Sequence, residues 1–220
     1  MFPAAMCILP RIVDLGLACL QSMFPALESM LATVTDCSRF IRILSLMSQI
    51  SCLYKGDVFP PLLLLATTAH HRCQAVAGPP QALPSTHASR DNVTSEVQRE
   101  AAEAYCSLML LMCNMMSTAP AGSFAHPAAA SLIMNFTGTA SAVARHTSDV
   151  SSLKQALVLF RRLMDHVPAS PLLQASLTQV NSPALTDFAA SRMRRSCLKQ
   201  RHWPRFAFRC ILLSTPRMPR

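Results

Sequence analysis

The sequence gathers residue types that could bind a metal ion at one place, His70-His71-Arg72-Cys73. On a helix, His70 and Cys73 would share a face, and Zn²⁺ accepts both imidazole nitrogen and thiolate sulfur. A zinc site takes three or four protein ligands, and no second group of this kind accompanies the first. We therefore interpret these residues as a polar helix end, where the negative end of the helix dipole stabilises imidazole.

The cysteines do not suggest a second reactive site. They are irregularly spaced without a Cys-x-x-Cys pair, and four of them lie in apolar stretches of helical period: Cys19, Cys52, Cys106 and Cys113. Cys106 and Cys113 would share a helix face, but the helical rise places them about 10 Å apart, too far for a disulfide. The pattern predicts buried free thiols in a reducing compartment.

A cluster of methionines lies around Cys113, at Met109, Met112, Met115 and Met116. Methionine at helical spacing is typical of a packed core, although a flexible thioether surface can also bind partners. We expect core.

The sequence lacks the short motifs of common enzymes. The few glycines are scattered and cannot form a phosphate-binding loop, and neither Gly-x-Ser-x-Gly nor His-Glu-x-x-His occurs. The acidic residues are dispersed, so no pair suggests general acid–base catalysis. We predict a chain that is not an enzyme and that uses no cofactor, metal ion or small-molecule substrate.

The strongest chemical signal lies at the carboxyl end, where residues 192–220 contain many Arg or Lys and no Asp or Glu. Arginine can contact phosphates and Trp203 can stack on a base, so this segment could bind nucleic acid. The candidate residues are Arg192, Arg194, Arg195, Lys199, Arg201, Trp203 and Arg205. A nuclear import signal and a tail without a selected role are the alternatives.

The charge of the tail differs from that of the rest of the chain. Basic and acidic residues balance over residues 1–190, so the net charge of +9 comes from the tail. The composition changes somewhere after Gln179. This break predicts an alternative isoform in which splicing changes the reading frame, and a transcript with a frame change near this point would test it. Because neither end looks capped by a polar outer face, we also expect an isoform or a fragment of a longer repeat protein.

The apolar residues recur mainly with the period of a helix, and prolines often stand where a helix would begin. Phe24-Pro25 and His126-Pro127 are read in this way, and Ser95 with Gln98 matches a capping box. In the segment 149–166 we expect one packed face formed by Leu153, Ala156, Leu157, Phe160, Leu163, Met164 and Val167. The predicted helices cover residues 11–23, 26–36, 38–54, 60–76, 94–117, 128–145, 149–166, 171–180 and 183–200.

These helices suggest four regions. Helical hairpins are expected over residues 1–76 and 93–190, joined by a loop over 77–92 that is rich in Pro, Ser and Ala. Residues 191–220 are expected to form a basic tail of low order. The predicted fold is all-α, with antiparallel helical hairpins stacked as a short α-solenoid or an irregular bundle.

The hairpin pairs 26–36 with 38–54, 128–145 with 149–166, and 171–180 with 183–200 resemble HEAT or armadillo-type repeats. The resemblance rests on helix length, pairing and buried Leu, Ala and Met faces. The stretch SLKQALVLFRRLMDHVPASPLLQASL is also similar to the armadillo-like meiosis inhibitor family. That resemblance implies a role in meiosis, in the formation of double-strand breaks.

From these observations we expect a non-catalytic scaffold or adaptor that binds other proteins through its helical faces. One alternative is a nucleic-acid-associated protein that acts through the tail. The other is a membrane-associated protein that uses residues 104–144, but their apolar core, YCSLMLLMCNMM, is shorter than the ~20 residues of a membrane span. Because the first residues lack a basic segment ahead of their apolar run, we expect an intracellular chain, cytoplasmic or nuclear.

Overall fold

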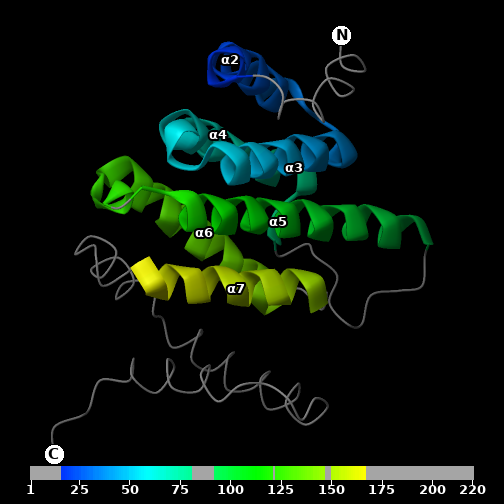
Figure 1. The fold of residues 1–220 in the computed structure, drawn as a ribbon. Coiled ribbons are helices and arrows are strands. Elements are labelled where there is room, and N and C mark those ends of the chain that lie inside the picture. The colour runs from blue at the N-terminus through cyan, green and yellow to red at the C-terminus, as the bar shows by residue number, and fades with distance from the viewer. Residues whose placement is uncertain (1–15, 81–91, 121, 147–149, 167–220) are drawn as a thin grey trace, which may run out of the picture. The chain divides into compact units, whose positions relative to one another are not determined.

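The computed structural model describes residues 16–80, 92–120, 122–146 and 150–166. Helices account for nearly all of these residues, and no strand occurs among them, which confirms the predicted all-α class. The elements are α2 (Leu17–Thr33), α3 (Cys37–Tyr54), η2 (Lys55–Val58), α4 (Phe59–Ala77), α5 (Asn92–Thr118), η4 (Ser123–Ala125), α6 (Pro127–His146) and α7 (Val150–His166) (Figure 1). All of them belong to one compact unit, Met1–Gln174.

The helices of this unit form two rows. The most extensive contacts join α3 to α5 and α5 to α7, and a second series joins α2 to α4 and α4 to α6 (Figure 1). The helices on the two sides of the segment 77–92 therefore pack against one another. We name α3, α5 and α7 the charged row and α2, α4 and α6 the charge-poor row, because Lys, Arg, Asp and Glu are concentrated in the first set.

Helices within the charged row run parallel. Near the beginnings of α3 and α5, the Ser38 hydroxyl donates to Glu100 Oε1 over 3.3 Å. Near their ends, the hydroxyls of Ser51 and Thr118 lie 2.9 Å apart. At the beginning of α7, the Ser152 hydroxyl donates to the carbonyl of Ala102 in the first half of α5 over 3.1 Å. The beginnings of the three helices therefore lie at the same end of the unit.

The charge-poor row shows the same alignment. Late in α4, the Arg72 guanidinium donates to the carbonyl of Val34, directly after α2, over 2.6 and 2.8 Å. His70 Nε2 and Thr139 Oγ1, in the late parts of α4 and α6, lie 2.8 Å apart. The helices thus run parallel within each row, and the rows pack against each other to form an all-α bundle.

The core lies between the rows and along α5. The methionines Met109, Met112, Met115 and Met116 are all buried, which confirms their prediction as core. Cys113 is also buried, as predicted, whereas Cys106 is half-buried. Cys19 and Cys52 are exposed, so their prediction as buried thiols was wrong. Each lies beside a position that does face the core, Leu20 and Ser51 respectively, and a helix turns its next residue outward.

The first two predicted helices, 11–23 and 26–36, form one helix in the described part. α2 runs from Leu17 to Thr33 with Pro25 in its interior, so Pro25 does not begin a helix. A proline inside a helix removes one backbone hydrogen bond. The helix continues because Leu20, Phe24, Leu27 and Leu31 form one buried stripe across the proline, while Pro25 itself is exposed.

Several other helix ends were predicted with mixed success. Pro127 does begin α6, as predicted. α5 begins at Asn92, which places Ser95 inside the first turn and contradicts the predicted capping box.

In α7 the buried stripe is Ser152, Ala156, Leu159 and Leu163, whereas Leu157 is half-buried. The predicted helices 171–180 and 183–200 lie outside the described residues.

Candidate functional site

His70 and Cys73, the residues of the partial metal motif, lie in the protein core. α4 continues to Ala77, so His70 is not at a helix end, and its side chain is only 7% exposed. Cys73 is fully buried, whereas His71 is exposed. Within the described part of the chain, no group of three or more His, Cys, Asp or Glu side chains could hold a metal ion. The interpretation of these residues as a polar helix end was wrong, because His70 is buried against α6 and Cys73 is buried near Cys37 of α3 and Tyr105 of α5.

His70 joins α4 to α6. Besides its bond to Thr139, the imidazole packs on the ring of Phe136, with a centroid distance of 5.1 Å. Burial lowers the pKa of His70, and the neighbouring His71 lowers it further, while a backbone hydrogen bond with Asn135 opposes the shift. The geometry suits a neutral imidazole that fixes the register of two helices.

A second group of polar side chains, which is partly buried, lies where the beginning of α3 meets the end of α4 and the middle of α5. The Cys37 thiol donates to the carbonyl of Val76 over 3.5 Å, and the Tyr105 hydroxyl donates to the carbonyl of Gly78 over 2.6 Å. Burial raises the pKa of Cys73 and Tyr105 well above their ordinary values, and burial followed by Glu100 and Asp36 raises the pKa of Cys37. These groups stay protonated near neutral pH, so they are poor nucleophiles, and two of them bind carbonyls at a helix end.

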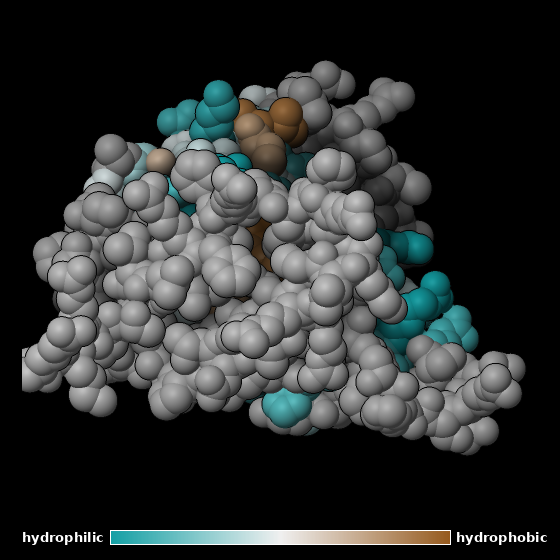
Figure 2. All heavy atoms as spheres, turned by 90° about the horizontal axis from the view of Figure 1, so that it is seen from below, coloured by the Kyte–Doolittle hydropathy of each residue, from teal (hydrophilic) through white to brown (hydrophobic). Residues whose placement is uncertain are grey.

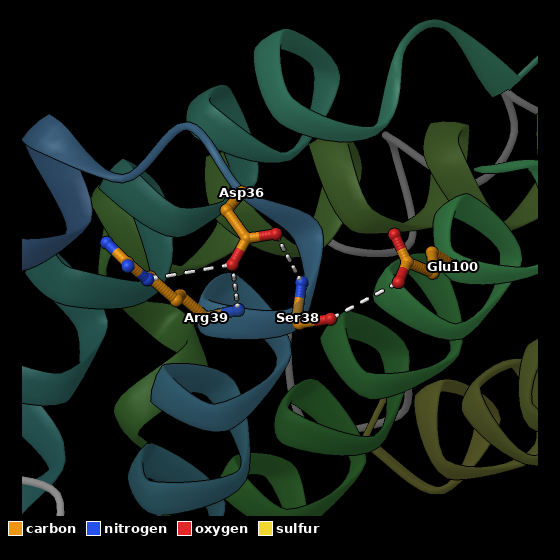
Figure 3. Close-up of polar contacts among 4 residues, drawn as sticks. All are labelled: Asp36, Ser38, Arg39 and Glu100. Carbon is orange, nitrogen blue, oxygen red and sulfur yellow. Dashed lines mark hydrogen bonds and ion pairs between the residues drawn. The ribbon is translucent and has the colours of Figure 1, made fainter. Parts of the chain in front are cut away.

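The exposed side of this junction carries a small polar network (Figure 3). Asp36 caps α3 by accepting hydrogen bonds from the backbone N–H groups of Ser38 and Arg39, at 3.4 and 3.2 Å. Its carboxylate also pairs with the Arg39 guanidinium at 3.7 Å. Figure 3 shows the Ser38 hydroxyl directed toward Glu100 of α5, away from that pair. Each of these contacts satisfies a helix end or aligns α3 with α5, so the network is structural.

Charged residues are distributed unevenly between the two rows. The helices of the charge-poor row contain Lys, Arg, Asp or Glu at Glu28, Arg72 and Arg145. The charged row contains many more, namely Arg39, Arg42, Glu96, Arg99, Glu100, Glu103, Lys154, Arg161, Arg162 and Asp165. Arg72 is used internally, since it binds the carbonyl of Val34. Of the described side chains in the charge-poor row, Glu28 is thus the charged one left facing solvent.

A shallow hollow of about 370 Å³ lies on the charge-poor row, between α2 and α4. It is lined by Gln21, Phe24, Pro25, Glu28, Pro61, Leu64 and Leu65. Leu64 stands out among them because 59% of it is exposed. Figure 2 views the molecule from below, on the face away from α2, and there mainly hydrophilic side chains are visible among the described residues, with a few hydrophobic ones between them. No sequence signal predicted the hollow, because its residues come from two helices and match no motif.

The remaining predicted sites are not brought into this arrangement. The candidate nucleic-acid-binding residues Arg192 to Arg205 lie outside the described residues. Among the residues that are described, no helix is long and apolar enough to cross a membrane. No protein-family model, no curated protein and no solved structure matches the chain.

Proposed function

We propose that the chain is a non-catalytic scaffold or adaptor segment, and that it binds other proteins through the outer face of the charge-poor row. The observation that carries this proposal is the distribution of charge. A surface facing only water usually carries interspersed charges of both signs, and the cores of protein interfaces are depleted of them. The charged row carries interspersed charges, as a surface that faces water does, and the charge-poor row is depleted of charges, as the core of an interface is.

The buried polar groups support a non-catalytic role. Burial stabilises the protonated thiols and the phenol at the α3–α4–α5 junction as well as the neutral imidazole of His70. The bonds of Cys37, Tyr105 and His70 each fix one helix against another. The stacking of parallel helices provides a long face of the kind that helical-repeat proteins use for binding.

The test compares proteins that co-purify with the chain and with matched surface variants. Gln74→Glu with Ser131→Glu places charges on exposed positions of the charge-poor row, and Ser45→Glu with Ser117→Glu does the same on the charged row. We expect specific partners to be lost with the first pair and retained with the second. Partners that are retained by the first pair and lost with the second would contradict the proposal.

A role in meiosis is the finer form of this proposal, supported by the resemblance of residues 152–177 to the meiosis inhibitor family.

A second candidate function is nucleic-acid binding through residues 192–205, supported by the composition of the tail. Phosphate contacts would make binding fall steeply with salt concentration, and removal of residues 192–220 should abolish that dependence. An unchanged salt dependence after truncation would exclude the tail as the binding segment.

A further inference from the structure

We propose that the hollow between α2 and α4 binds a protein segment that presents one large apolar side chain beside a lysine or arginine. This inference rests on the proposed function and assigns it a site and a partner chemistry. Three features of the hollow lead to it: its apolar walls, a main-chain acceptor without its helical donor, and a single carboxylate.

The apolar part of the hollow fits one anchoring side chain. Phe24 and Leu65 are 8% and 2% exposed and form part of its lining, while Leu64 projects with 59% of its surface exposed. The volume, about 370 Å³, is at the lower end of the ~300–1,000 Å³ of ligand pockets. Because the hollow is open, a free small molecule would stay largely wet, whereas a protein segment could cover the rim at the same time.

The main-chain acceptor results from Pro25. In a helix the carbonyl of residue i accepts from the N–H of residue i+4, and Pro25 has no N–H to donate to Gln21. Gln21 and Pro25 both line the hollow, so the carbonyl that lacks its helical donor belongs to the turn beside it. A hydrogen-bond donor on a bound segment could satisfy this oxygen.

The carboxylate defines the charge of the partner. Glu28 also lines the hollow and is exposed, and it forms no ion pair with another described residue. Glu28 and Gln21 are the polar residues of the lining, and the other five are Phe, Pro or Leu. A cationic donor next to an apolar anchor matches this combination, and an acidic segment would be repelled.

The experiment selects phage-displayed random peptides against the immobilised full chain. We expect the recovered peptides to combine Leu, Met, Phe or Trp with a nearby Lys or Arg. Leu64→Glu should weaken their binding by roughly tenfold or more, as expected for a central anchor contact. Leu110→Glu is the matched control, because Leu110 is a leucine of α5 that is 40% exposed. This variant should leave peptide binding unchanged.

Two further variants test the polar part. Glu28→Lys should change the selected peptides from basic to acidic ones. Pro25→Ala restores the helical donor to Gln21 and should weaken peptide binding about fivefold, the effect of one net hydrogen bond, although it stabilises α2. A loss of binding in that variant therefore cannot be attributed to unfolding.

The outcomes separate this inference from the proposed function. If the peptides bind the Leu64→Glu variant as tightly as the original chain, but lose binding when the face is changed at Gln74 and Ser131, the hollow is excluded and the proposed function stands. If no peptide depends on any position of the charge-poor row, both are overturned. Selected peptides without a basic residue would contradict the assigned partner chemistry.

Discussion

His70 shows how one residue can look like a ligand in the sequence and serve as a connector in the fold. Its spacing to Cys73 is that of a partial metal site, yet both side chains are buried in the contact of α4 with its neighbours. The imidazole bonds to Thr139 and stacks against Phe136. A buried neutral group of this kind links the stability of the protein to pH.

The free energy of unfolding should fall as the pH is lowered below 6.5. Burial lowers the folded pKa of His70 from its ordinary value of 6.5, so the unfolded state binds the proton more readily in acid. The stabilisation is present above pH 6.5 and is lost as the pH falls toward the lower, folded pKa. Urea unfolding between about pH 5 and pH 7.5 measures this, and His70→Gln should remove the share of the dependence that belongs to His70.

His71→Gln is the control for that experiment. His71 is the adjacent, exposed imidazole, and its ring lies 5.7 Å from that of His70. The His71→Gln variant should retain most of the pH dependence. Equal slopes in the original chain and the His70→Gln variant would show that His70 is not the group that titrates.

At the scale of elements, the continuous helix α2 is stabilised by the packing of its buried stripe rather than by the helix propensity of its residues. Pro25→Ala should raise the free energy of unfolding by about 1–3 kcal/mol, because it restores a helical hydrogen bond and removes a ring clash. Chemical denaturation measures the change. Pro60→Ala, at the first turn of α4 where no helical hydrogen bond is lost, should have a much smaller effect. A Pro25→Ala variant that is less stable would show that the proline suits α2 as it stands.

α7 offers a second test at this scale, since its sequence is apolar on more than one side. Leu159 is 2% exposed and faces the packed side, while Leu157 is half-buried. Leu159→Ala should cost about 2–5 kcal/mol of unfolding free energy, and Leu157→Ala should cost clearly less. The reverse order would favour the face that the sequence predicted.

These two elements show what the sequence could and could not predict. Helical periodicity predicted most of α3, α4, α5, α6 and α7 with small errors at their ends. It failed at Pro25, where a continuous buried stripe outweighs the local effect of proline. On α7 it predicted Ala156 and Leu163 correctly, but it also chose Leu153, Leu157 and Phe160, which are half-buried. Periodicity gives the spacing of an apolar face, whereas tertiary packing selects among several such faces.

The candidate site was not predictable for a similar reason. The hollow combines Phe24 and Glu28 of α2 with Leu64 of α4, and residues so far apart in sequence meet only when the helices stack. The positions of the charged residues can be read from the sequence. They define a charge-poor surface only after the structure shows which helices share a row. The motif that the sequence did display, at His70 and Cys73, has a structural role.

At the scale of the whole unit, the parallel alignment of the helices separates the few charged residues of the charge-poor row from the many charged residues of the charged row. α2, α4 and α6 lie in one row and α3, α5 and α7 in the other. If neighbouring helices of a row ran antiparallel instead, the contacts Ser38–Glu100 and Ser51–Thr118 could not both form. The proposed binding face therefore depends on this alignment.

Disulfide formation in double-cysteine variants tests the alignment most directly. In the Ser51→Cys, Thr118→Cys variant the new thiols would replace hydroxyls that lie 2.9 Å apart, so mass spectrometry after mild oxidation should detect a 51–118 disulfide. In the Ser38→Cys, Thr118→Cys variant the thiols would lie at opposite ends of α3 and α5, and no 38–118 disulfide should form. A 38–118 disulfide without a 51–118 disulfide would contradict the parallel stacking and the binding face derived from it.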